Sequence, residues 1–338
     1  MRTSVVGFGR MGARLCEAAE RAGHDIVAVL DSAEAPFGLG PRPGLADRLH
    51  RDPEAFWSVP SEILVIGTTA PSHMPLLEEG LARGFRRIIV EKPFSSSVVE
   101  ARRVMAAARS AGARVLVDHT RRYCPNFRKV AERAPELAHL GRLRTVSSTH
   151  GGGSLGCSGV HYLDLCNMLF GGPPKSVFAE LTEPAGPNPR GAEFSDPGGP
   201  VMMTYPDGGR AFLDFGDDIG AYAGFQMVFE EGIVRHGFDE FEPWEVFARK
   251  PEDRGKGKHL LGLPLVAEAF PGWSGMSQMD RWVELFVDAA ADTPPLSGAD
   301  VGLETMEAFA AARWSARTGA VVSLPLPTEA EAAVYPIP

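Results

Sequence analysis

Cysteine is scarce in this sequence and scattered along it. Four cysteines occur among 338 residues, and no two of them form a CxxC pair. A zinc ribbon or a redox dithiol is therefore not expected, and we predict no metal site. A chain of this length buries enough surface to fold without disulfide staples, and free thiols suit a reducing compartment. We therefore expect a cytoplasmic protein.

Long hydrophobic runs are missing as well. No stretch approaches the roughly 18 consecutive apolar residues that a membrane-spanning helix requires. The opening residues, MRTSVVGFGR, enter a strand at once and contain no apolar signal core. These two features lead us to expect no membrane partner and no secretory signal.

Basic charge is not in excess. Lys and Arg together number 34 against 43 Asp and Glu, which gives a formal net charge of −9. A general nucleic-acid binder needs a basic face that displaces counterions from phosphates, so we expect no nucleic-acid partner. This net charge leaves room for a small basic pocket that holds an anionic substrate.

Short apolar strands alternate with helices over the first third of the chain. Apolar runs predict strands at residues 2–6, 26–30, 62–66, 87–90 and 114–117. Amphipathic spacing predicts helices at residues 13–22, 73–83 and 98–111. Strands and helices in this order specify right-handed βαβ units and a parallel sheet. Residues 1–120 are therefore predicted to form one domain of the α/β class.

The pattern changes after Tyr123. Short strands now follow one another, and turn signals such as the Pro-Asp-Gly-Gly of 206–209 join them, so a mainly antiparallel sheet is expected. Helices are predicted at residues 159–170 and 301–318. We predict that residues 121–338 form an α+β domain that closes the cofactor crevice.

A glycine-rich turn lies between the first strand and the first helix. Gly7-Phe8-Gly9-Arg10-Met11-Gly12 matches the G-x-G-x-x-G fingerprint in the context that the fingerprint requires. The first glycine permits the tight turn, the second lets a pyrophosphate approach the backbone, and the third lets helix and strand pack closely. The helix N-terminus then offers free N–H groups to the phosphates. We predict that these six residues bind a dinucleotide and that residues 1–120 are an NAD(P)-binding Rossmann domain.

Asp31 indicates which dinucleotide it is. It ends the second strand, about 20 residues after the last glycine, where an acid accepts hydrogen bonds from the ribose 2′-OH and repels a 2′-phosphate. The preferred cofactor is therefore NAD. NADP stays open as the alternative, because a neighbouring arginine can override a single acid.

Four stretches in order resemble the glucose-fructose oxidoreductase / inositol dehydrogenase / MocA family. The first is GFGRMG at 7–12, and the second is the strand end Ile66-Gly67-Thr68-Thr69 with His73. The third is Glu91-Lys92-Pro93, and the fourth is GGGSLGCSGVHYLD at 151–164, which is similar to the family's G-G-G-x-L-x-D-x-G-x-H-x-x-D. The tail, from PLSGADVG to SLPLP, also resembles the family's last helix and strand.

This resemblance implies a nicotinamide-dependent dehydrogenase that acts on a sugar, a polyol or a nucleotide-linked sugar. It implies that the second domain binds the substrate and has an open sheet, through which a homodimer or homotetramer assembles. By the same resemblance, Lys92 meets both nicotinamide and substrate, and Glu91 contacts the nicotinamide ribose. We also place Thr68, Thr69 and His73 at the cofactor on this ground. A solvated lysine at the end of a strand is the alternative interpretation of Lys92.

His161 is the second candidate catalytic residue. A histidine titrates near neutrality, so it can take a hydroxyl proton while hydride leaves the same carbon. In the family the histidine of this motif does that work, and the alternative is a packed histidine of the second domain. The family has Asp where this chain has Cys157, one turn before His161. A thiol cannot orient an imidazole as a carboxylate does, so activity is expected to be slower, to use another acid, or to be absent.

Arg122 and Tyr123 follow the last strand of the parallel sheet, at its carboxyl edge. A guanidinium at this edge is able to hold a phosphate or carboxylate in a bidentate manner. The family has a polar segment here that ends in an arginine before Phe or Tyr, so the resemblance implies that Arg122 and Tyr123 contact the substrate, together with Cys157 and His161. An interdomain salt bridge is the alternative for Arg122.

Three functions remain open. The first is hydride transfer between nicotinamide and a sugar-like alcohol or ketone. The second is an NAD-holding sensor or adaptor with the same fold and little or no activity, which the missing aspartate favours and the intact Lys92 and His161 oppose. NAD-assisted glycoside cleavage also occurs in the family, but no residue of this chain points to it.

Overall fold

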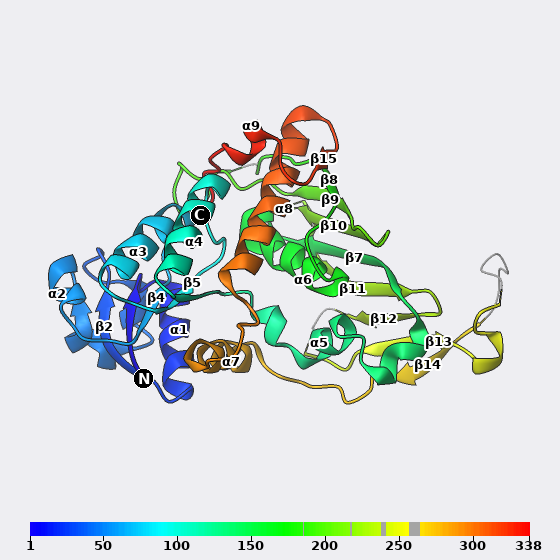
Figure 1. Cartoon of the computed structure of the whole chain (residues 1–338), viewed down its shortest axis with the longest axis horizontal. Helices are drawn as coiled ribbons and strands as arrows, with labels where there is room; N and C mark the ends of the chain where they lie inside the picture. The colour runs from blue at the N-terminus through cyan, green and yellow to red at the C-terminus, as the bar shows by residue number, and fades with distance from the viewer. Residues whose placement is uncertain (185, 217, 238–240, 257–263) are drawn as a thin grey trace.

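The computed structural model describes residues 1–184, 186–216, 218–237, 241–256 and 264–338. They form two sheets with helices packed on them, as Figure 1 shows. Helix α8 (Ala299–Thr318) runs between the sheets, contacting β6 and α4 of the first and β8 and α6 of the second. A single hydrophobic cluster crosses from one domain into the other along this helix.

The first sheet is parallel and has the strand order β3-β2-β1-β4-β5-β6. Its strands are β1 (Arg2–Val6), β2 (Asp25–Leu30), β3 (Leu49–His50), β4 (Ile63–Ile66), β5 (Arg87–Val90) and β6 (Arg114–Val117). The helices that connect them are α1 (Arg10–Arg21), the short α2 (Pro53–Trp57), α3 (Ala70–Ala82) and α4 (Val98–Ser110). Strand order reverses between β1 and β4, and ligands of open α/β sheets bind at the carboxyl ends of the strands beside such a reversal.

The second sheet has nine strands in the order β14-β13-β12-β11-β7-β10-β9-β8-β15. Only the β7–β10 pair is parallel among the described pairs, so the predicted mainly antiparallel sheet is confirmed. Its strands are β7 (Leu143–Gly151), β8 (Ser176–Ala179), β9 (Gly199–Thr204), β10 (Arg210–Gly216), β11 (Tyr222–Phe229), β12 (Gly232–His236), β13 (Glu245–Arg249), β14 (Leu265–Ala269) and β15 (Val322–Ser323). Besides α8 and α7 (Gln278–Ala290), the α-helices of this half are α5 (Pro125–Ala131), α6 (Val160–Phe170) and α9 (Thr328–Glu331).

Helix α7 (Gln278–Ala290) was not predicted from the sequence. It belongs to the second half of the chain but returns to the first sheet, where it packs against α1, β5 and β6. Trp282, Leu285, Phe286 and Ala289 have the spacing of one helical face and are buried in the core on that side of the sheet. This helix therefore connects the second half of the chain to the first sheet and fixes the orientation of the two halves.

The beginnings of two helices also differ from the sequence prediction. Helices α1 and α3 begin three residues earlier than expected from periodicity, at Arg10 and Ala70. Their first turns hold phosphate-loop or strand-end residues, which lack an apolar repeat. No helix in the described segments has the length and apolar character that crossing a membrane demands.

Candidate active site

The carboxyl ends of the first sheet open onto a cavity of about 970 Å³ that extends to α6 of the second domain. Ten of the residues singled out in the sequence line it: Gly7, Gly9, Arg10, Met11, Asp31, Thr68, Thr69, Glu91, Lys92 and Cys157. His161 lines it as well, from the other side. The fingerprint turn, the strand ends and the second-domain motif therefore face one space.

The glycine turn has the geometry that a dinucleotide requires. Gly7 has a φ of +89°, which favours glycine, and a Cβ at Gly12 would lie 1.9 Å from the Gly7 carbonyl oxygen. A Cβ at Gly9 would meet nothing within 4 Å, so this glycine leaves open space in front of the backbone. Helix α1 begins here with no side-chain cap and no acid in its first turn. Its N–H groups are therefore available to a pyrophosphate.

Asp31 is held in place by the same turn. Its Oδ2 accepts a hydrogen bond from the Phe8 N–H at 2.6 Å, and its Oδ1 accepts one from the Ala33 N–H at 2.8 Å. The carboxylate borders the cavity, and each oxygen keeps a second lone pair. Phe8 itself contributes backbone only, because its ring is fully buried. This arrangement fits a ribose 2′-OH and opposes a 2′-phosphate.

Glu91 and Lys92 follow β5 directly. Oε2 of the buried Glu91 accepts from the Lys92 N–H at 2.5 Å, and its Oε1 is buried with no hydrogen bond in the described chain. Burial raises the pKa of Glu91, and the charge of Lys92 opposes that shift. The Nζ of Lys92 donates to the Cys157 carbonyl oxygen at 2.7 Å. The lysine therefore spans the cavity from the first domain to the second.

His161 lies in the first turn of α6. Its Nδ1 is buried and makes no hydrogen bond within the described residues. Burial is the main reason that the pKa of His161 lies well below its usual 6.5, and the nearby Lys92 and Arg121 lower it further. The imidazole is therefore neutral near pH 7, which is the form that accepts a proton.

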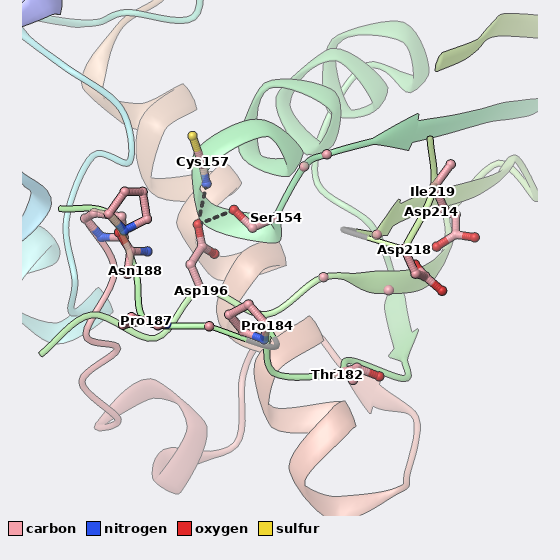
Figure 2. A pocket seen from close by; sticks show the side chains of 18 of the residues that line it. Ser154, Cys157, Thr182, Pro184, Pro187, Asn188, Asp196, Asp214, Asp218 and Ile219 are labelled. Carbon is pink, nitrogen blue, oxygen red and sulfur yellow. Dashed lines mark hydrogen bonds between the residues drawn. The ribbon is translucent and has the colours of Figure 1, made fainter. Parts of the chain in front are cut away.

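Cys157 sits in a wide helical turn, Leu155–Gly159, that precedes α6. An acid from elsewhere in the chain caps this turn: buried Asp196 accepts from the Ser154 hydroxyl at 2.6 Å and from the Cys157 N–H at 2.8 Å (Figure 2). It also accepts from the Gly156 N–H at 2.6 Å. Sequence analysis did not single out Asp196. All three hydrogen bonds of the Asp196 carboxylate are therefore made to this turn.

Arg122 and Tyr123 do not line the cavity, which corrects the sequence assignment. The Arg122 Nε donates to the buried Asp164 at 2.8 Å, and the buried Tyr123 donates its hydroxyl to Asp288 at 2.7 Å. The two residues belong to a 3-10 turn, Thr120–Tyr123, in which successive side chains point about a third of a turn apart. Arg121 of that turn faces the cavity instead, with its guanidinium 4.7 Å from the Tyr162 ring centre.

His73 does not line the cavity either. It is fully buried, and its ring nitrogens lie 2.9 Å from the Pro93 carbonyl oxygen and 3.1 Å from that of Thr68. Burial lowers the pKa of His73 to about 4. Its position ties the loop after β4 to the loop after β5, so it supports the cofactor wall from behind.

Asp118 is a cavity residue that the sequence analysis missed. Asp118 is the first residue after β6, and Lys92 is the second residue after β5. Both line the cavity, so a polar residue directly after a strand of the parallel sheet was the sequence signal that could have identified Asp118. The buried carboxylate accepts from the Trp282 indole of α7 at 3.1 and 3.0 Å. Burial first, and the charge of Glu91 second, raise the pKa of Asp118 well above its usual value. The cofactor wall therefore holds two desolvated carboxyl groups.

Comparison with known families places both halves of the chain. Residues 1–119 match the model described as an oxidoreductase family with an NAD-binding Rossmann fold, and residues 132–235 match the GFO/IDH/MocA C-terminal domain. A D-apiose dehydrogenase from Paraburkholderia graminis is 30% identical over 166 residues. That alignment covers 44% of this chain and 44% of the relative, so the chain spans less than half of the relative's length.

Solved structures share the fold at low identity. An oxidoreductase from Agrobacterium radiobacter, in complex with NAD+, L-tartaric acid and magnesium, superposes with a TM-score of 0.76 at 16% identity, covering 96% of this chain and 98% of that one. The WlbA dehydrogenase from Bordetella pertussis, in complex with NADH and UDP-GlcNAcA, gives 0.73 at 19% identity, covering 97% and 99%. These likenesses establish the two-domain fold.

The geometry of Asp31 predicts a preference for NADH over NADPH. Placing a 2′-phosphate beside a fixed carboxylate costs several kcal/mol, so NADH binds at least about tenfold more tightly. Asp31→Asn removes the charge and keeps an oxygen for the Phe8 N–H, so it lowers the ratio of the NADPH dissociation constant to the NADH dissociation constant. Fluorescence titration with both cofactors measures it.

The matched control is Asp25→Asn. Asp25 begins the same strand at its far end and pairs with Arg48 on the surface, so its variant keeps the wild-type ratio. NADPH binding equal to or tighter than NADH in the wild type, or an unchanged ratio in Asp31→Asn, contradicts the assignment.

Proposed function

The chain belongs to the GFO/IDH/MocA family of NAD-binding oxidoreductases, and from this premise we propose that it transfers a hydride between nicotinamide and a secondary alcohol or ketone carbon. The proposed substrate is a sugar, a polyol or a nucleotide-sugar. The observation that supports the proposal most strongly is the hydrogen bond between the Lys92 Nζ and the Cys157 carbonyl oxygen. It puts the strand-end lysine and the turn before His161 on two sides of one cavity.

The side chains divide the work in this proposal. The bound cofactor supplies the hydride acceptor or donor, and the glycine turn with Asp31 holds its adenosine half. Lys92 is the only described lysine bordering the cavity, and it holds and polarises the substrate oxygen. The neutral imidazole of His161 takes the hydroxyl proton in the oxidation direction and returns it in reduction. Arg121 replaces Arg122 as the candidate partner for an anionic substrate group.

A sensor or adaptor that binds NAD without turnover is the second candidate. The observation that favours a sensor is Cys157, because the position one helical turn before His161 then carries no carboxylate. Asp196, the acid beside that turn, is committed to three hydrogen bonds. Both candidates need the same cofactor site, so turnover decides between them.

We also propose that two copies of the chain associate through the second sheet. The strands β9 and β10 bury alternate residues against the helices and turn Met202 and Phe212 outward, with exposed fractions of 37% and 44%. These two side chains border a groove of about 540 Å³ on the sheet face. Exposed apolar surface on a sheet is typical of an interface. A homodimer or homotetramer is the proposed assembly.

Lys92→Met tests the catalytic proposal. The variant keeps an apolar stem of similar length and removes the ammonium, so turnover falls by about two or more orders of magnitude while NAD+ binding changes little. NADH formation is followed against a panel of sugars, polyols and nucleotide-sugars. Turnover within about threefold of the wild type excludes the proposed role.

Lys129→Met serves as the matched control. Lys129 also donates from its Nζ to backbone carbonyls, those of Pro271 and Gly272, but it does not line the cavity. This variant is expected to retain wild-type kcat and KM. If turnover falls as much in Lys129→Met as in Lys92→Met, the effect comes from losing a lysine that is hydrogen-bonded to the backbone and not from a catalytic role of Lys92.

Phe212→Lys tests the assembly. A charge placed at the centre of an apolar contact is desolvated at a cost of several kcal/mol, so sedimentation velocity shows a shift from oligomer to monomer. Val287→Lys is the control, because Val287 is 49% exposed on α7, away from the sheet face. A monomeric wild type, or an unchanged oligomer in Phe212→Lys, contradicts the proposal.

A further inference from the structure

His119 is buried behind the cofactor wall, and its ring makes no hydrogen bond among the described residues that would explain its position. It follows Asp118 at the carboxyl end of β6 and is 1% exposed. Neither ring nitrogen has a hydrogen-bond partner within the described part of the chain. Leaving a buried polar group unpaired costs about 1–3 kcal/mol, so a side chain with two such atoms needs an explanation.

The surroundings of His119 supply one. Its ring meets the ring of His161 edge to face, with centroids 6.2 Å apart and planes at 88°. Asp164, one turn beyond His161 on α6, raises the pKa of His119 against the larger effect of burial. Asp164 uses Oδ1 for Arg122 and Thr305, whereas its Oδ2 is buried without a hydrogen bond in the described structure.

Three neighbouring groups therefore have unused polar atoms. They are the Nδ1 of His161, both ring nitrogens of His119 and the Oδ2 of Asp164. Catalytic hydrogen bonds are often long before substrate binds and tighten in the complex. Polar groups that lie beyond direct hydrogen-bond distance are commonly joined by one bridging water. His161 lines the cavity and its ring contacts that of His119, and the charge of Asp164 acts on His119; we call these three residues the row.

We propose that His119 is the positioning residue of His161, connecting it to Asp164 in place of a carboxylate at position 157. The inference rests on the proposed function. His119 holds the His161 imidazole in one tautomer, and Asp164 in turn fixes His119. When His161 takes the hydroxyl proton, the charge is shared along the row towards the Asp164 carboxylate. The proton count is unchanged: one proton leaves the hydroxyl oxygen and stays on the histidine pair until it passes to solvent.

The charges around the row agree with this role. His119 faces Asp164, Arg122 and Lys92, and burial lowers the pKa of His119 to about 4. His161 faces Lys92, Arg121 and His150 in addition to His119, and all four lower the pKa of His161. Both imidazoles are therefore neutral at pH 7. A neutral imidazole carries one N–H and one free lone pair, which lets His119 donate towards Asp164 and accept from His161.

A substrate-free experiment tests the tautomer directly. The ring nitrogens of His161 are observed by 15N NMR at pH 7 in the wild type and in His119→Phe, which keeps an aromatic ring of similar size. The wild type is expected to show one tautomer, and His119→Phe a mixture or the opposite tautomer. His119→Gln retains a donor and an acceptor and keeps the wild-type pattern. An unchanged pattern in His119→Phe overturns the inference.

The matched control is His24→Phe. His24 is also a buried histidine in edge-to-face contact with a ring, that of Phe286, but it precedes β2 at the opposite end of the sheet. Its variant leaves the His161 signals unchanged. If His24→Phe shifts them as much as His119→Phe does, the effect is structural and the inference fails. His119→Gln decides the same question should His119→Phe not fold.

Turnover provides the second readout. Loss of an orienting partner behind a functional histidine lowers activity about 10- to 100-fold. We expect His119→Phe to lower kcat by that factor while KM stays within about threefold of the wild type. In His119→Gln the decrease in log kcat is expected to be at most half of that in His119→Phe. A change confined to KM overturns the positioning role. A wild type without turnover on the whole substrate panel contradicts the proposed function instead, and the NMR result still decides the inference about His119.

Discussion

The hydrogen bond from the Lys92 Nζ to the Cys157 carbonyl oxygen joins the two domains at the point where chemistry is proposed. Its donor stands at the end of a parallel strand, and its acceptor lies in the turn that opens α6. This contact has the right length only because the two sheets are held at a fixed distance. Helix α8, buried between them, and helix α7, returned to the first sheet, impose that distance. The cavity is therefore a product of the packing of both halves.

Buried ionisable groups collect around this contact. Desolvation raises the pKa values of Glu91 and Asp118 and lowers those of His119 and His161. Several of their polar atoms have no partner within the described residues, which costs stability that the two-domain core must offset. Such strained electrostatics are typical of sites that hold a charged ligand or move a proton. Asp196, by contrast, is fully hydrogen-bonded and serves the turn.

The local elements of the first domain could be predicted because each depends on neighbouring residues. Continuous apolar runs defined β5 and β6 to the residue, and the glycine fingerprint located the cofactor turn. Long-range packing could not be predicted in the same way. The apolar face of α7 is visible in the sequence, but nothing there says that it covers α1. Adjacent arginines 121 and 122 look equivalent in the sequence, and only the rotation of a 3-10 turn assigns one to the cavity and the other to Asp164. Asp196 and His119 matter only through segments that folding brings beside them.

In the proposed mechanism, one cavity receives the cofactor from the first domain and presents it to His161 of the second. A crystal structure of the protein with NAD+ tests it most directly. We expect the pyrophosphate over the N-terminus of α1, the adenosine ribose on Asp31, and the nicotinamide between Lys92 and His161. A nicotinamide ring bound outside the space that Lys92 and His161 border, with the pyrophosphate still on the glycine turn, would contradict it.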